Sequence, residues 1–320
     1  MPALSKHFGE KPKLDPGHTA VSHGTWPTRS DWHFMFLLPL LAALAWIVPP
    51  RFWARLGGKP NLRTTEEFAR DFLEYTENTS KNRGRVYFDK PEIMTYLREY
   101  SPLGWQPSIT LENVETLEAA RTAGSGAVLW VADFSRSQLV AKKALCAAGY
   151  EMFHLSRPIH GPVESSFGVR WLNWTFQRAE TKYLKQRVVI EDGNEVAGLR
   201  TLRKALKAGE FVSVTAGRES RNVVWLPFRE GRYPFAPGAP LLAAGTGAPL
   251  LAVFVLRDPD DFERFRVVID GPIEAPEGLS REETVRSMME QYLALHEAYL
   301  PLYEPVWDGR RSFRFGPPGA

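Results

Sequence analysis

Apolar residues along the central part of the chain follow two alternating spacings. Short apolar runs typical of strands are separated by longer segments in which apolar residues recur every three or four positions, as in a helix. The expected strands cover residues 127–132, 150–155, 187–190, 211–215, 222–226, 250–256 and 264–269. The expected helices cover residues 113–123, 137–148, 165–179, 195–208, 238–245 and 280–300, and another starts at the capping-box sequence of residues 64–67. This alternation predicts an α/β fold with a mixed, largely parallel sheet flanked by helices.

Residues 32–50 contain no Asp, Glu, Lys or Arg. As a helix they would extend about 28 Å at 1.5 Å per residue, close to the roughly 30 Å of a bilayer's hydrocarbon core. Three interpretations are open: a single membrane span, an interfacial or re-entrant anchor, and a buried core helix. Four basic residues follow the segment, and only Arg29 lies close before it. The positive-inside rule therefore predicts an inner (plasma) membrane protein with the bulk of the chain facing the cytoplasm.

The apolar segment divides the chain into four parts. Residues 1–31 are polar and lack periodicity, and we expect a disordered tail there. Residues 32–50 are the expected membrane anchor helix, and residues 51–308 the expected α/β domain. Residues 309–320 are basic and then rich in Gly and Pro, which favours a C-terminal surface tail.

Composition excludes several kinds of chemistry. A formal net charge of +3 gives no reason to expect a nucleic-acid partner. The single cysteine, Cys146, excludes an intramolecular disulfide, and its apolar surroundings predict a buried, inert thiol. The spacing of the histidines suggests no metal cage. Lys142 and Lys143 are expected to be solvated charges on a helix, and His154 a satisfied histidine of a strand.

The segment from Gly126 to Leu139 runs from an apolar strand through a polar turn into a helix. Together with Arg157-Pro158, Leu226-Pro-Phe228 and the stretch 237–251, it resembles the lipid A biosynthesis (lauroyl/myristoyl) acyltransferase family of the lysophospholipid acyltransferase superfamily. That family has a His and, after four residues, an Asp or Glu at this turn. Asp133 and Gln138 stand in these two positions, so the family's defining pair is altered here.

The resemblance implies a glycerolipid acyltransferase-like fold and the transfer of a fatty acyl chain. The donor would be an acyl carrier protein or coenzyme A thioester, with no other cofactor and no metal. The acceptor would be a hydroxyl of a membrane lipid or glycolipid in bacterial envelope lipid biosynthesis. By the resemblance, Asp133 and Gln138 would be the catalytic pair, and Arg157 and Phe228 would bind substrate. From the residues themselves, His160 is a further candidate catalytic residue, and Arg136 and Arg218 are further candidate substrate-binding residues.

Acyl transfer requires a base that takes the proton of the attacking hydroxyl. An imidazole with a pKa near 6.5 suits this task, whereas an aspartate with a pKa near 3.9 is a poorer base unless burial raises that value. Gln138 cannot ionise, and His160, in a neighbouring loop, is a candidate to assist Asp133. The arginines are candidates for binding a phosphate, a carboxylate or a phosphopantetheine group.

The altered pair leaves two functions open. In the first, which we favour, Asp133 supports acyl transfer. In the alternative, the protein is a catalytically inactive family member that binds lipid or a partner enzyme as a regulator or scaffold.

Overall fold

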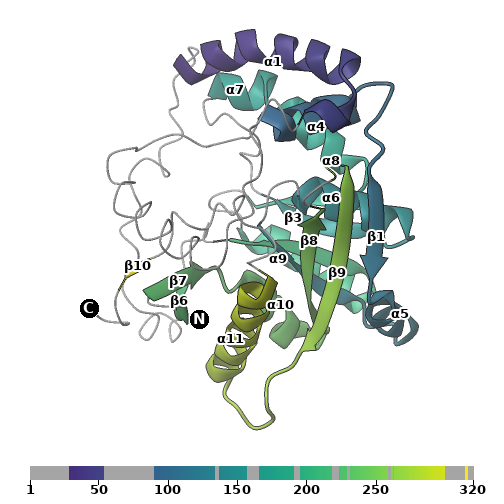
Figure 1. The fold of residues 1–320 in the computed structure, drawn as a ribbon. Helices are drawn as coiled ribbons and strands as arrows, with labels where there is room; N and C mark the ends of the chain where they lie inside the picture. Colours follow the sequence, from purple (N-terminus) through teal and green to yellow (C-terminus); the bar gives the residue numbers. More distant parts are fainter. Residues whose placement is uncertain are drawn as a thin grey trace.

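The computed structural model describes residues 29–53, 90–133, 137–156, 166–190, 195–217, 223–228, 231–258, 261, 263–299 and 314–315. Its largest element is a seven-stranded sheet with strand order β1-β9-β8-β2-β5-β3-β4 (Figure 1). The strands are β1 (Ser108–Glu112), β2 (Ala127–Ala132), β3 (Met152–Ser156), β4 (Gln186–Val189), β5 (Phe211–Ala216), β8 (Leu250–Arg257) and β9 (Arg264–Ile273). Neighbouring strands pair in parallel except β8 and β9, which pair antiparallel. The prediction of an α/β fold with a mixed, largely parallel sheet is confirmed.

Helices cover both faces of this sheet (Figure 1). One face carries the α6-side core, to which α1 (Arg29–Ile47), α4 (Lys90–Tyr100), α5 (Val114–Thr122), α6 (Ser137–Ala147) and α8 (Trp174–Thr181) contribute buried residues. The other face carries the α11-side core, with residues from α9 (Glu195–Lys207), α10 (Gly238–Thr246) and α11 (Arg281–Tyr299). Two short elements complete the described helices: η2 (Pro50–Phe52) and α7 (Ser166–Trp171).

A small antiparallel sheet extends the α11-side core. It consists of β6 (Val224–Phe228), β7 (Gly231–Phe235) and β10 (Arg314–Phe315), in the order β10-β7-β6. Strand β10 lies within the expected C-terminal tail of residues 309–320. Buried side chains of β6 and β7, such as Leu226 and Phe235, join the larger core.

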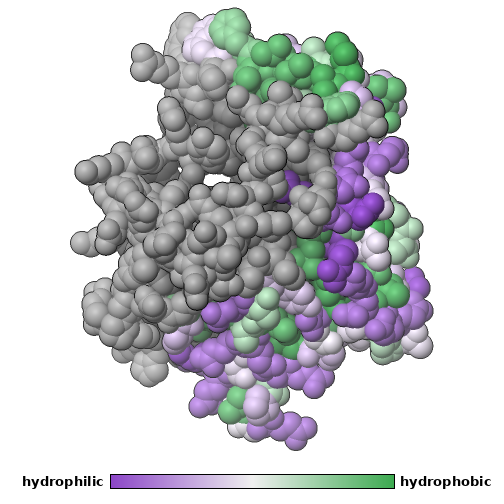
Figure 2. Space-filling view, viewed as in Figure 1, coloured by the Kyte–Doolittle hydropathy of each residue, from purple (hydrophilic) through white to green (hydrophobic). Residues whose placement is uncertain are grey.

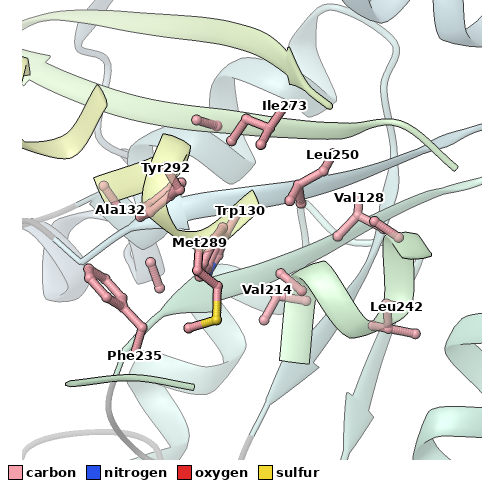
Figure 3. Packing of buried hydrophobic residues seen from close by; sticks show 14 of the residues in the cluster. Val128, Trp130, Ala132, Val214, Phe235, Leu242, Leu250, Ile273, Met289 and Tyr292 are labelled. Carbon is pink, nitrogen blue, oxygen red and sulfur yellow. The ribbon is translucent and has the colours of Figure 1, made fainter. Parts of the chain in front are cut away.

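Strand β2 is the middle strand of the large sheet, and all six of its residues are buried. Side chains alternate between the two faces of a strand. Val128 and Trp130 therefore belong to the α11-side core, and Leu129 and Val131 to the α6-side core. Figure 3 shows Trp130 among the packed side chains of the α11-side core, near Tyr292 and Phe235. A strand covered on both faces reads as an unbroken apolar run, which explains why the sequence pattern located β2 correctly.

Gly126 sets the approach to β2. Its φ of +59° lies in the left-handed region, and a Cβ atom there would collide with the backbone oxygen of Glu210. Glycine has no Cβ atom and adopts positive φ at low cost, so it allows the turn before β2 to lie against the turn before β5.

The apolar N-terminal segment forms helix α1, which packs along α4 (Figure 1). The helix begins at Arg29, and Leu41 and Ala45 on one of its sides are buried in the α6-side core. Among the helices of the described ranges, none combines the length and apolarity needed to cross a bilayer. The expected membrane anchor helix at residues 32–50 is therefore not supported as a membrane span. The helix expected from residue 64 lies outside the described residues, as do residues 1–28 of the expected tail. Residues 29–31, also expected in that tail, instead form the first residues of α1.

Candidate functional site

The carboxyl ends of β2, β5 and β3 lie next to one another, because these strands are parallel neighbours. After β2 the chain forms β3 and β4 on one side of it, and then returns to form β5 between β2 and β3. It later forms β8 on the other side of β2. Strand order therefore reverses at β2, and α/β proteins commonly bind ligands at the carboxyl edge of such a reversal point. This edge is our candidate site.

Asp133 directly follows the last residue of β2 at this edge and is exposed. Gln138 lies in the first turn of α6, the helix that leads away from β2. The structure thus places both residues where a strand ends and the next helix begins, as the sequence predicts. Among the described residues, they are the two predicted site residues that lie at this junction.

The side-chain amide of Gln138 is unusual because its Oε1 and Nε2 atoms are both buried and neither has a hydrogen-bond partner in the structure's described part. A buried polar group left unpaired costs about 1–3 kcal/mol. Such groups call for an explanation, and a site that pairs them with a ligand is one. Gln138 cannot ionise, but its amide can both donate and accept hydrogen bonds.

Four further predicted site residues lie outside the described residues: Arg136, Arg157, His160 and Arg218. Arg157 directly follows the last residue of β3, and Arg218 comes two residues after the last residue of β5.

Phe228, the remaining predicted substrate-binding residue, is buried at the end of β6. Its ring centroid lies 6.0 Å from that of Tyr233 and 6.4 Å from that of His296. The structure therefore places Phe228 in the aromatic part of the α11-side core.

A row of polar side chains crosses the sheet below the edge. His154 on β3 is in register with Ser213 on β5 and with Arg187 on β4. The Nδ1 atom of His154 and the Oγ atom of Ser213 are 2.8 Å apart and share a hydrogen bond. His154 is buried and satisfied within a strand, as the sequence analysis predicts.

Arg187 extends this row toward the helices that cover β3 and β4. Its Nε atom donates to Ser156 Oγ at 2.9 Å, and its Nη1 atom donates to Gln177 Oε1 at 2.9 Å. Burial lowers the pKa of the guanidinium, and the nearby carboxylate of Glu180 opposes this effect. Arg187 is therefore a half-buried cation that hydrogen bonds to Ser156 and Gln177 hold in position.

The α6-side core contains a buried ion pair between Lys142 on α6 and Glu180 on α8. Tyr96 on α4 donates from its hydroxyl to Glu180 Oε1 at 2.6 Å. Burial lowers the pKa of Lys142, whereas Glu180 raises it. The prediction that Lys142 is a solvated charge is wrong, because its partner comes from a helix 38 residues further along the chain.

The pKa of Tyr96 is affected both by this ion pair and by Asp133 of the candidate site. Burial raises the pKa of its hydroxyl most, and the carboxylates of Glu180, Glu92 and Asp133 raise it further. Asp133 also contributes to the raised pKa of Tyr292, on the opposite face of the sheet, after burial and Tyr233. The negative charge of Asp133 thus raises the pKa of one tyrosine in each core.

A second polar cluster lies around Glu99, near the C-terminal end of α4. Lys143 forms an ion pair with its Oε2 atom at 3.0 Å, and Lys182 and Tyr183 contact its Oε1 atom. Burial raises the pKa of Glu99, but hydrogen bonds from Lys182, Tyr183 and Lys143 outweigh it, so the pKa lies below its ordinary value. This cluster ties α4, α6 and α8 together.

The α11-side core contributes an aromatic cluster that the sequence analysis did not single out. The ring of Tyr292 stacks on Trp130 with 3.9 Å between centroids, and His296 lies 6.2 Å from Tyr292. The hydroxyl of Tyr292 is buried and has no hydrogen-bond partner in the described ranges. Apolar periodicity along residues 280–300 predicts the helix, but gives no signal that these polar atoms are buried.

Cys146 is half-buried, and burial raises the pKa of its thiol, followed by the effect of Glu151. A raised pKa disfavours the reactive thiolate. The side chain is, however, less completely buried than the sequence analysis predicts. Among the residues that the structure describes, no group of three or more His, Cys, Asp or Glu side chains is placed to hold a metal ion.

The fold and the edge together define a class: an α/β protein with a polar site at the carboxyl end of its central strand. No protein-family model matches the chain, and no curated protein matches its sequence. The similarity to acyltransferases therefore rests on the residues quoted above.

Proposed function

We propose that the protein is a membrane-associated acyltransferase-like enzyme of bacterial envelope lipid biosynthesis with a glycerolipid acyltransferase-like fold. It transfers a fatty acyl chain from an acyl carrier protein or coenzyme A thioester to a lipid or glycolipid hydroxyl. One observation carries the proposal: Asp133 and the unpaired amide of Gln138 lie at the carboxyl end of the central strand, where strand order reverses. This junction corresponds to the strand-turn-helix segment that resembles the acyltransferase family.

In the proposed reaction, the hydroxyl oxygen of the acceptor attacks the thioester carbonyl while Asp133 accepts the proton of that hydroxyl. A new C–O ester bond forms, the C–S bond breaks, and the proton passes to the departing thiolate to give the free thiol of the carrier. The Gln138 amide donates a hydrogen bond that orients the reacting groups. Basic residues of the same edge, Arg157 and Arg218 by their place in the sequence, would hold the anionic parts of the substrates.

The test compares wild-type protein with Asp133→Asn, a nearly isosteric change that removes the proton acceptor. Lauroyl-acyl carrier protein and lauroyl-coenzyme A serve as donors, and a bacterial lipid extract in detergent serves as acceptor. We expect transfer by the variant to fall by about 10²–10⁴-fold, the usual contribution of a general base. The control is Glu277→Gln, which removes an exposed carboxylate in the segment between β9 and α11.

Transfer that survives Asp133→Asn would remove Asp133 from the reaction. A wild-type protein that transfers from neither donor, together with an unchanged lipid profile in cells lacking the gene, would overturn the enzymatic proposal.

A second candidate function is the inactive family member that regulates or scaffolds a partner. One observation favours it: Asp133 is exposed, and an aspartate in water is a weak base near neutral pH. A regulator predicts that Asp133→Asn cells have the wild-type phenotype. It also predicts that the protein co-purifies with a lipid enzyme whose activity changes when the gene is deleted.

A further inference from the structure

Helix α1 is apolar around most of its circumference, but within the described part of the protein one of its sides is buried and the opposite side is exposed. Leu41 and Ala45 are buried in the α6-side core, and Leu37, Ala42 and Val48 pack against it. A helix that is hydrophobic on all sides normally has all of its sides covered. The side of α1 that faces away from α4 is therefore the feature to be explained.

The uncovered side carries large apolar residues at helical spacing. At about 100° per residue, Trp32, Phe36, Leu40, Trp46 and Ile47 fall within one arc of roughly 120°, opposite Leu41 and Ala45. Phe36 is 76% exposed and Ile47 is 80% exposed. Figure 2 shows hydrophobic surface gathered over α1 at one end of the molecule. Exposed apolar patches of this kind mark sites of protein or membrane interaction.

Polar contacts at its C-terminal end hold α1 on the protein. Arg98 on α4 donates from Nη1 to the carbonyl oxygens of Ala45 at 3.0 Å and Trp46 at 2.9 Å. Trp53 donates from Nε1 to the carbonyl oxygen of Val48 at 2.9 Å. These bonds satisfy carbonyl groups that a helix end leaves unpaired. A surface that covers the exposed side of α1 therefore contacts the helix while the helix remains packed on the protein.

The charge of the surrounding sequence indicates which surface this is. Between Trp32 and Thr65 there is no acidic residue, and Arg51, Arg55, Lys59 and Arg63 follow the helix. Basic residues beside an apolar, tryptophan-containing helix favour an anionic lipid surface. Tryptophan in particular prefers the boundary between lipid headgroups and acyl chains.

We infer that α1 lies flat on an anionic lipid surface and inserts its exposed apolar side between the headgroups, while its other side stays packed on α4. The inference rests on the proposed function only for the identity of the lipid substrate, and its test needs no catalysis. The arrangement brings the whole α/β domain to the surface on which a lipid acceptor would reside.

The test measures co-sedimentation of the full chain with vesicles of phosphatidylethanolamine and phosphatidylglycerol. Phe36→Glu combined with Leu40→Glu places two charges on the inserted side, and we expect the apparent Kd to rise about a hundredfold. The matched control is Leu103→Glu, because Leu103 is 60% exposed and Leu40 is 58% exposed. We expect the control to bind vesicles as the wild type does, and circular dichroism checks that all variants are folded.

Two further measurements separate this arrangement from other occupants of the same side. Alkaline carbonate should release the wild-type protein from bacterial membranes, as it does proteins that lie on a bilayer, and retention would overturn the flat arrangement. Light scattering should show the same mass for wild type and the double variant. A dimer that only the double variant loses would assign the side to a second copy of the chain and overturn the inference.

The chain's own N-terminal segment is the remaining occupant to test. Vesicle binding by the protein lacking residues 1–28, with none by the full chain, would assign the side to that segment and overturn the inference. Asp133→Asn should bind vesicles like the wild type, so a failure of the proposed reaction is distinguishable from a failure of the lipid contact.

Discussion

Lys142 and Glu180 form an ion pair whose side chains are only 2% and 4% exposed, between helices α6 and α8. Tyr96 completes the arrangement by donating to the second oxygen of Glu180. Two charges in a core are tolerated when each compensates the other and their remaining hydrogen-bonding capacity is satisfied. Removing one partner is therefore far more costly than removing both.

The first prediction concerns this pair. Glu180→Gln should lower the free energy of unfolding by about 3–5 kcal/mol, because it leaves the Lys142 ammonium buried without a counter-charge. Lys142→Met combined with Glu180→Met should cost clearly less, since no charge remains in the core. Urea unfolding at neutral pH measures both. Equal costs would mean that the pair is not coupled as the structure indicates.

The second prediction concerns pH and Glu99. The unfolded pKa is near the ordinary 4.5, and the folded pKa lies below it. The stability that this carboxylate contributes is therefore complete above about 4.5 and is lost as pH falls through the folded pKa. Glu99→Gln should be less stable than wild type by about 1–3 kcal/mol near pH 7. The difference should shrink in acid, and a difference that stays constant below pH 4.5 would contradict the assignment.

The third prediction separates stability from function at Gln138. Gln138→Leu removes an unpaired buried amide and should raise the free energy of unfolding by about 1 kcal/mol. If the amide serves the proposed reaction, acyl transfer should fall in the same variant. The control is Gln177→Leu, which removes the acceptor of the Arg187 Nη1 hydrogen bond and should destabilise the protein. Destabilisation by Gln138→Leu would show that the amide has a structural partner.

The fourth prediction concerns two tyrosines of α11. Tyr292→Phe removes a buried hydroxyl for which the described residues provide no partner, so thermal stability should stay the same or rise. Tyr299→Phe removes the 3.1 Å hydrogen bond to Asp270 Oδ2 and should lower stability by about 0.5–1.5 kcal/mol. Calorimetry of the two variants provides the comparison. A marked loss of stability in Tyr292→Phe would place a partner at that hydroxyl.

Most of the α/β framework is predictable from apolar spacing. Strand β2 was predicted with its observed bounds, and α6 and α10 to within one residue, because each has an uninterrupted local pattern. The helix expected at residues 165–179 is instead two helices, α7 and α8. Helix α4 was missed because buried polar residues such as Thr95 and Glu99 interrupt its apolar pattern. Strand β1 was missed because it lies at the edge of the sheet and is nowhere fully buried.

The candidate site, too, is only partly predictable from the sequence. The sequence alone identifies Asp133 and Gln138, because the junction of an apolar strand, a polar turn and a helix is a local pattern. It cannot show that β5 lies between β2 and β3, which brings the ends of three strands to one edge. That arrangement depends on pairing between residues far apart in the chain, as in the register of His154 with Ser213.

The sequence by itself determined the α/β class, the apolar character of residues 32–50 and the altered pair at the end of β2. Each of these depends on residues that are neighbours along the chain. Only the tertiary structure decided that Lys142 is buried against Glu180, and that α1 packs one side on α4 while exposing the other. Burial is decided by partners that are distant in sequence, and local spacing carries no information about which distant residues will meet.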